Sequence, residues 1–403
     1  MKKNEIVLLL ILALVQFTNV VDFMIVMPLG PVLKQLWGID STQFSRIVSA
    51  FSIGAFVSAM ACLAFVDRFD RKPVLLIVYA GFTLGTFCCG LANSYNQLVA
   101  ARFVTGLFGG IGGSVILSMV GDYIPNQRRG QAMGILMTGF ALASVVGVPG
   151  GLWLAANYQW HTPFIILASL CSVVFFLALF IVPSFTAHLQ LGVVKKKAYQ
   201  ILYTIFSNKD MRWALLFSSL LMMSHFAIIP FLTDFATYNL GVNYKTDIPL
   251  IYIIGGLLTV VCSPQVGKLS DKYGRLPLFT ILSFLALIPM LVLPNLTTNN
   301  LWVLLPTFAT VFVFSGSRMV IGSAQITSTA TSQERGSFLI VNSSIQQLST
   351  GIIAAVGGAV VSNDEAKRVL HYPILGIIGL VLAMLALVCF KKIIANKKIS
   401  EAK

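Results

Sequence analysis

Long apolar runs, separated by short polar stretches, fill almost the whole chain. Because one membrane crossing needs roughly 20 apolar residues, the sequence contains about twelve such runs. This pattern predicts an all-α integral membrane protein. The predicted spans lie near residues 6–29, 44–66, 74–92, 97–121, 130–155, 162–182, 213–238, 247–267, 276–294, 300–327, 336–361 and 369–390.

One polar stretch is longer than the others and divides the chain. It covers residues 184–212, includes Lys195-Lys196-Lys197, and falls between the sixth and seventh predicted spans. We interpret it as a cytoplasmic linker. The sequence then predicts an N-terminal six-helix bundle over residues 1–183. A C-terminal six-helix bundle with a short cytoplasmic tail follows over residues 213–403.

Composition and charge agree with a membrane protein. Hydrophobic residues make up 57% of the chain and charged residues 10%, whereas soluble domains carry about 25% charged residues. The net charge of +14 does not point to nucleic acid, because most Lys and Arg residues fall in loops that an inward N-terminus places inside. That bias follows the positive-inside rule. It predicts both termini in the cytoplasm and a location in the inner (cytoplasmic) membrane.

A charged turn occurs twice, about half a chain apart. In the first copy Asp67 is followed by Arg71, and in the second Asp271 is followed by Arg275 at the same spacing. A second short motif, in which glycine follows arginine, occurs at Arg129-Gly130 and again at Arg335-Gly336, at nearly the same separation in sequence. Matching motifs in two halves of a membrane protein indicate a duplicated helical bundle, which is typical of transporters.

These motifs resemble those of the major facilitator superfamily across essentially the full chain. The family's cytoplasmic loop motif runs Gly-x-Leu-Ala-Asp-Arg-x-Gly-Arg-Lys, and residues 267–275 match it closely. The first copy keeps Asp67, Arg68 and Arg71 but lacks the usual glycines. Residues 102–110 match the family's fourth-helix motif, an arginine followed by glycines. Residues 147–151 are similar to the fifth-helix motif of antiporters.

The first helix is similar to that of one branch of this family. Asp22 followed by Pro28 and Pro31 looks like the twelve-helix drug:proton antiporters, a branch that includes sugar- and metabolite-efflux relatives. The resemblance implies two pseudosymmetric six-helix bundles with the substrate between them. It also implies proton-coupled export of a small molecule, a drug or a metabolite, by alternating access. We expect a monomer in the lipid bilayer.

Other functions stay open at this point. The imperfect fifth-helix motif leaves room for a proton-coupled importer of a polar metabolite. A lipid or amphipath transporter of the same fold and a non-transporting sensor are further alternatives. An enzyme is not expected, since the sequence has no visible nucleophile–base–acid set, metal cluster or phosphate-binding loop. No cofactor is expected.

Proton coupling is predicted at Asp22 and Arg102. Asp22 lies in the outer half of the first predicted helix, and Arg102 lies at similar depth in the fourth. A carboxylate at membrane depth is costly and is functional by default. We therefore predict that Asp22 carries the proton and that Arg102 balances its charge. The alternative is a permanent structural salt bridge between two helices.

Several residues are candidates for substrate binding. Arg318, deep in the tenth helix, could bind an anionic or carbonyl-rich group, pair with Asp22, or hydrogen-bond backbone carbonyls in a broken helix. The polar side chains could line a cavity or join helices, and the ring of Phe23 could be cavity wall or core. The candidates are Asn19, Phe23, His225, Arg318, Asn342 and Gln346.

The family resemblance implies a cytoplasmic gate. In the family, contacts between the loop motifs hold the two halves together in the outward-open state, and these contacts break in the inward-open state. The alternative is that these charges serve only membrane topology, because exposed ion pairs contribute about 0–1 kcal/mol. The gating candidates are Asp67, Arg68, Arg71, Arg128, Arg129, Asp271 and Arg275.

Overall fold

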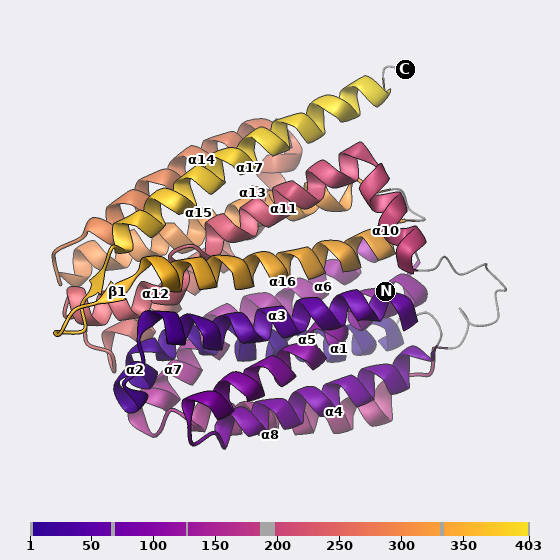
Figure 1. Ribbon diagram of the computed structural model, residues 1–403. Coiled ribbons are helices and arrows are strands. Elements are labelled where there is room, and N and C mark those ends of the chain that lie inside the picture. The colour runs from indigo at the N-terminus through magenta and orange to yellow at the C-terminus, as the bar shows by residue number, and fades with distance from the viewer. Residues whose placement is uncertain (1–2, 66–68, 126–127, 186–197, 331–333, 402–403) are drawn as a thin grey trace. The chain divides into compact units, whose positions relative to one another are not determined.

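The computed structural model describes residues 3–65, 69–125, 128–185, 198–330 and 334–401 (Figure 1). In this part of the chain, twelve helical segments are long and apolar enough to cross a membrane. The predicted all-α fold with twelve spans is therefore confirmed.

The first half of the sequence is a series of helices. They are α1 (Lys3–Ile25), η1 (Met27–Leu29), α2 (Gly30–Trp37), α3 (Ser41–Phe65), α4 (Arg71–Gly90), α5 (Tyr95–Tyr123), α6 (Arg129–Leu142), η4 (Ala143–Gly147), α7 (Val148–Asn157) and α8 (Thr162–Ile181). Here η1 is a 3-10 turn and η4 is a π-helical turn.

The second half is helical apart from one short hairpin. Its helices are α10 (Ala198–Ser207), α11 (Lys209–Phe226), α12 (Ile229–Asp234), η5 (Phe235–Asn239), α13 (Asp247–Tyr273), α14 (Arg275–Val292), η6 (Leu293–Asn295), α15 (Leu301–Thr327), α16 (Arg335–Val360) and α17 (Tyr372–Glu401). Strands β1 (Ser362–Asn363) and β2 (Val369–Leu370) pair antiparallel. The sequence pattern did not indicate this hairpin.

The first span is longer than predicted. Helix α1, η1 and α2 together form one apolar run from Asn4 to Trp37, whereas the sequence suggested an end near residue 29. Proline lacks a backbone N–H and interrupts a helix, which explains the 3-10 turn at Pro28 and the restart of α2 at Pro31. As a consequence Lys34, which follows the predicted end of this span, lies within the helical run and is buried.

The chain forms two compact units. Unit 1 consists of residues 1–26, 50–202 and 336–348, and unit 2 consists of residues 27–49, 203–335 and 349–403. Each unit takes segments from both halves of the sequence. The bundle boundaries at residues 183 and 213 stay predictions. Residues 186–197 of the expected linker, including its three lysines, lie outside the described residues.

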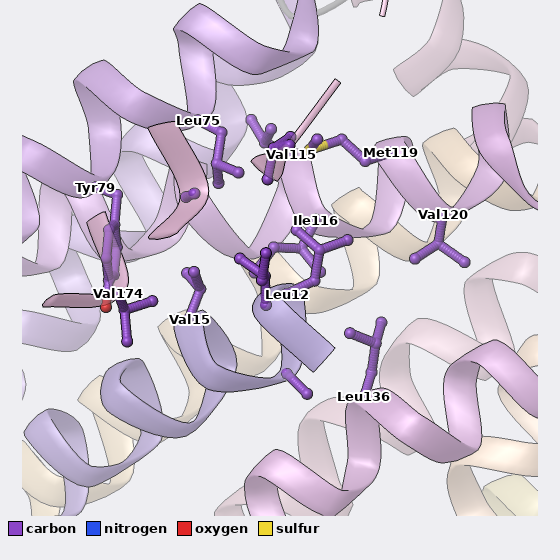
Figure 2. Close-up of a cluster of buried hydrophobic side chains, with 14 of the residues drawn as sticks. Leu12, Val15, Leu75, Tyr79, Val115, Ile116, Met119, Val120, Leu136 and Val174 are labelled. Carbon is purple, nitrogen blue, oxygen red and sulfur yellow. The ribbon is translucent and has the colours of Figure 1, made fainter. Parts of the chain in front are cut away.

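The core of unit 1 is a cluster of buried hydrophobic side chains (Figure 2). Lipid is as apolar as leucine, so close van der Waals packing, rather than escape from water, holds such helices together. Helices α1, α4, α5, α6 and α8 all contribute. The labelled members are Leu12, Val15, Leu75, Tyr79, Val115, Ile116, Met119, Val120, Leu136 and Val174.

Glycines let α3 and α5 approach each other closely within unit 1. A Cβ atom on Gly106 would collide with the backbone of Phe51, and one on Gly110 would collide with the backbone of Ala55. By contrast, Gly113 has no neighbour within 4 Å of an added Cβ. Gly106 and Gly110 therefore allow close packing of α3 against α5, whereas Gly113 does not contribute to it.

This difference gives a matched stability test. Gly106→Ala is expected to lower the free energy of unfolding by about 1–3 kcal/mol, because overpacking against backbone cannot be relieved by a rotamer change. Gly113→Ala makes the same chemical change in open space and should leave stability unchanged or slightly raised. Thermal unfolding in detergent measures both. Equal melting temperatures would contradict this account of the α3–α5 contact.

Candidate functional site

A fully buried ion pair joins α1 and α5 in unit 1. The Arg102 Nη1 atom lies 2.5 Å from Asp22 Oδ2, and both side chains are completely buried. The same nitrogen donates to the backbone oxygen of Asp22 at 3.1 Å. The two residues that the sequence singled out for proton coupling are therefore in direct contact. Their role in coupling stays a prediction.

Two further helices complete the surroundings of this pair. Thr86 of α4 donates its hydroxyl to Asp22 Oδ1 at 3.0 Å, so both carboxylate oxygens have a partner. The Arg102 guanidinium lies 4.5 Å from the ring centroid of Phe51 on α3, a favourable position for a cation over an aromatic face. The sequence gave no signal for Thr86, because isolated hydroxyls are common in membrane helices.

The arginine of this pair is less fully satisfied than the carboxylate. Arg102 Nε and Nη2 are buried and have no hydrogen-bond partner among the described residues. Breaking a buried pair by removing one partner typically costs about 3–5 kcal/mol, because the other charge is left uncompensated.

Two more candidates lie beside the pair in unit 1. Asn19, about one turn before Asp22 on α1, donates to the Gly109 backbone oxygen at 3.1 Å. The ring centroids of Phe23 and Phe51 are 5.4 Å apart. Asn19 therefore joins α1 to α5, and Phe23 packs against the ring that covers Arg102. Both side chains are half-buried.

Unit 2 contains a buried polar group around Arg318. This side chain is completely buried on α15 and donates from Nη2 to the Ser224 hydroxyl of α11 at 3.2 Å. Its Nε and Nη1 atoms have no hydrogen-bond partner among the described residues, and the same holds for Nδ1 of the neighbouring His225. A buried guanidinium with free N–H groups is suited to bind an anionic group.

The amide candidates lie on another segment. Asn342 is buried on α16, and its Oδ1 atom has no hydrogen-bond partner among the described residues. Gln346, one turn further along, is half-buried. This part of α16 belongs to unit 1, whereas His225 and Arg318 belong to unit 2. The amides of α16 and the guanidinium of Arg318 therefore belong to different units.

The gating candidates have varied surroundings. Asp67, Arg68 and the Arg129 side chain lie outside the described residues. Arg128 pairs with Glu5 of α1 at 2.8 Å; Glu5 was not among the predicted gating residues. Arg275 contacts the end of α15, donating to the Ala324 backbone oxygen, Gln325 Oε1 and the Ser328 hydroxyl. Arg71 is buried, and Asp271 is exposed.

A second embedded acid was not among the sequence-based candidates for proton coupling. It is Asp234, which lies on α12 within the predicted seventh span. The Asp234 side chain is 0% exposed and pairs with Lys34 at 2.6 Å. Its apolar neighbours on both sides were the signal that could have identified it. No group of three metal-ligating side chains occurs among the described residues.

Comparisons with known proteins point in one direction. The family model "Major Facilitator Superfamily" matches residues 12–355. The multidrug resistance protein MdtG of Erwinia billingiae is 27% identical over 329 residues, which is 76% of this chain and 79% of MdtG. The gallate transporter of Pseudomonas putida is 30% identical over 134 residues, which is 33% of this chain and 30% of that protein.

Similarity to solved structures concerns the fold. A crystal structure of a D-xylose–proton symporter aligns with a TM-score of 0.74 and 16% identity, covering 95% of this chain and 96% of the symporter. Four of the relatives matched by sequence, the gallate transporter among them, are spanned over only 23% to 43% of their own length. The matched relatives and structures named here are transporters, and none is an enzyme.

Proposed function

Because the chain belongs to the major facilitator superfamily, we propose that it is a proton-coupled secondary transporter that exports a small molecule by alternating access. The exported compound is a drug or a metabolite. We place this multi-pass protein in the cytoplasmic membrane as a monomer, with both termini in the cytoplasm, as the charge bias predicts.

The buried Asp22–Arg102 pair is the observation that carries this proposal. Both side chains are 0% exposed, so the carboxylate exchanges a proton with water only when the helices around it move. Separation of the pair leaves an uncompensated charge, which a proton neutralises. Re-formation of the pair expels that proton. A conformational change that alters the distance between α1 and α5 is thereby coupled to proton movement.

Export is supported by two observations. The 147–151 segment is similar to the antiporter motif of the family, and in the structure it lies where the π-helical turn η4 meets α7. MdtG, which is similar over most of both chains, is named as a multidrug resistance protein. Proton binding on the outer side would then drive release of the substrate to the outside.

A second candidate function is favoured by Arg318. Its unpartnered N–H groups are suited to a carboxylate, and the matched region of the gallate transporter comes from a carrier of an aromatic acid. On this alternative the protein imports a polar, anionic metabolite together with a proton. The two candidates share the Asp22 site and differ in direction.

Membrane vesicles of defined orientation separate the two candidates. We expect energised inverted vesicles to accumulate compounds from a panel of cationic dyes and aromatic carboxylates, and a protonophore to abolish this accumulation. Vesicles without the protein are the control. Accumulation only in right-side-out vesicles would establish the importer. Ligand binding without any flux would contradict transport and indicate a sensor.

A further inference from the structure

Lys34 and Asp234 form a second buried ion pair, in unit 2. Lys34 Nζ lies 2.6 Å from Asp234 Oδ2, with side chains 5% and 0% exposed. The ammonium also donates to the Ser41 hydroxyl at 2.8 Å. It lies 5.6 Å from the ring centroid of Phe44 and 5.5 Å from that of Phe231. The ammonium therefore has several partners, and Asp234 is only one of them.

The Asp234 carboxylate has fewer stabilising contacts than the Lys34 ammonium. Neither oxygen of Asp234 has a hydrogen-bond partner among the described residues apart from its contact with Lys34. The α2 backbone lies directly against it, since a Cβ atom on Gly30 would be 2.6 Å from Asp234 Oδ1. Lys34 is therefore the group that compensates this buried negative charge.

The pair is part of a larger set of contacts between segments far apart in sequence. Residues 27–49, which we call the α2 corner, meet α12, η5 and the 358–363 segment at one end of unit 2 (Figure 1). Ser41 donates to Asn363 Oδ1 at 2.6 Å, and Thr42 donates to the Gly358 backbone oxygen at 2.8 Å. These contacts join the first half of the sequence to the second.

Two tyrosines add to this junction. Tyr238 of η5 donates to the Pro31 backbone oxygen at 3.0 Å. Tyr244, in the loop after η5, donates to the Pro28 backbone oxygen at 3.2 Å. Burial raises the pKa of the Tyr244 hydroxyl, so it stays protonated and keeps donating. The α2 corner is thus fixed by hydrogen bonds that do not titrate and by one ion pair.

Among the described residues, Lys34 is the sole cation facing Asp234. Helix α3 contributes Ser41 and Phe44, and β1 contributes Asn363, all without charge. The other titratable groups that sense the Asp234 charge are phenols, which are neutral near pH 7. They are Tyr238 on η5, Tyr244 in the following loop, Tyr252 on α13 and Tyr372 on α17.

We propose that Asp234 is a second proton site, which opens the junction at the α2 corner when it takes up a proton. This inference rests on the proposed transport by rocking of the two sequence halves. Lys34 moves with the first half and Asp234 with the second, so the outward-open state separates them. Lys34 keeps the Ser41 hydroxyl and the Phe44 ring, because both belong to its own half.

Asp234 has no such replacement partner. Once separated, its carboxylate is a buried charge without compensation, and binding a proton to form an O–H bond neutralises it. Lys34 keeps its own proton, so one proton enters the site for each opening. The positive-inside orientation places this end of the protein outside. The proton therefore comes from the outside, where an exporter's coupling ion enters.

A cysteine reporter tests the proposal. Ser49 is 5% exposed and donates to the Ser45 and Gly351 backbone oxygens at 2.8 and 3.1 Å. It lies further along α3 than Ser41 and Phe44, the two residues of this helix that contact Lys34. In a chain whose native cysteines are replaced, Ser49→Cys is treated with a membrane-impermeant thiol reagent. We expect slow modification at neutral pH and faster modification as the external pH falls.

Variants identify the group responsible. Asp234→Asn is expected to raise modification at neutral pH at least about tenfold, the lower end of coupling measured for close charge pairs, and to remove its pH dependence. Lys34→Gln should also speed modification. Asp247→Asn, the same change elsewhere in unit 2, is the control and should behave as the parent. Rates at each pH are divided by those of a small free thiol under the same conditions, which corrects for titration of the thiol itself.

The readout needs neither substrate nor a proton gradient, so its failure can be distinguished from a failure of the proposed function. Transport that fails while the Asp234 response persists would contradict the export proposal alone. Unchanged modification in a correctly folded Asp234→Asn protein would overturn the second proton site and leave a static ion pair. A response to pH in Asp234→Asn, or modification that rises only in inverted vesicles, would overturn it too.

Discussion

Replacing Asp22 with asparagine is expected to reduce gradient-driven transport to the background of empty liposomes. The carboxylate of Asp22 is 0% exposed and lies 2.5 Å from Arg102. An amide cannot carry the proton, so a pH gradient no longer drives the cycle. Exchange of labelled for unlabelled substrate needs no net proton movement and should continue. Parallel measurements of uphill transport and exchange in proteoliposomes check this prediction.

The controls for Asp22→Asn test whether the variant still folds and whether a carboxyl group at this position restores transport. Asp22→Asn leaves Arg102 without its ion-pair partner, and such losses can cost about 3–5 kcal/mol. Size-exclusion behaviour and the retained exchange activity show whether the protein is intact. Asp22→Glu keeps a carboxyl group and should restore part of the uphill transport. Full uphill transport by Asp22→Asn would show that the pair is a permanent structural salt bridge.

Replacing Arg318 with methionine is expected to raise the KM for an anionic substrate roughly 10- to 100-fold. The guanidinium is buried, and two of its nitrogens have no hydrogen-bond partner in the part of the chain that the structure describes. Hydrogen bonds to charged groups contribute about 1.5–3 kcal/mol. Cationic or neutral compounds should lose much less affinity. Concentration dependence of transport for matched carboxylate and amide compounds measures the difference.

Two further variants refine the Arg318 result. Arg318→Lys keeps the positive charge but loses the planar pair of donors, so an intermediate KM is expected. Ser224→Ala removes the neighbouring hydroxyl, which lies 3.2 Å from Arg318 Nη2, and should change KM little. Equal losses for the carboxylate and the amide would show that Arg318 holds helices together and does not bind the substrate.

The sequence was sufficient for the fold because membrane insertion imposes a simple pattern. Each crossing requires a long apolar helix, and the twelve predicted spans correspond to the twelve in the structure. The contact between Asp22 and Arg102 could also be predicted, since both charges lie at similar depth in apolar runs. Thr86 could not, because its hydroxyl looks like any other until the helices are packed.

The Lys34–Asp234 pair shows where sequence reasoning failed. Span ends are judged from hydropathy, and the prolines at 28 and 31 suggested that the first helix had ended. The chain instead continues through η1 into α2, which brings Lys34 into the helical run. Asp234 lies inside the predicted seventh span, 213–238, but close to its outer end, so hydropathy did not show that its side chain would be buried. Which charged residues pair across segments that are distant in sequence depends on how the helices pack, and hydropathy does not show this.

Substrate-driven proton movement in proteoliposomes tests the central claim most directly. Wild-type protein and Asp22→Asn are reconstituted with a pH-sensitive dye inside, and compounds that bind are added without any other driving force. The account predicts that a transported compound moves protons in wild-type liposomes and moves none with Asp22→Asn. Proton movement of equal size in both would contradict coupling through Asp22.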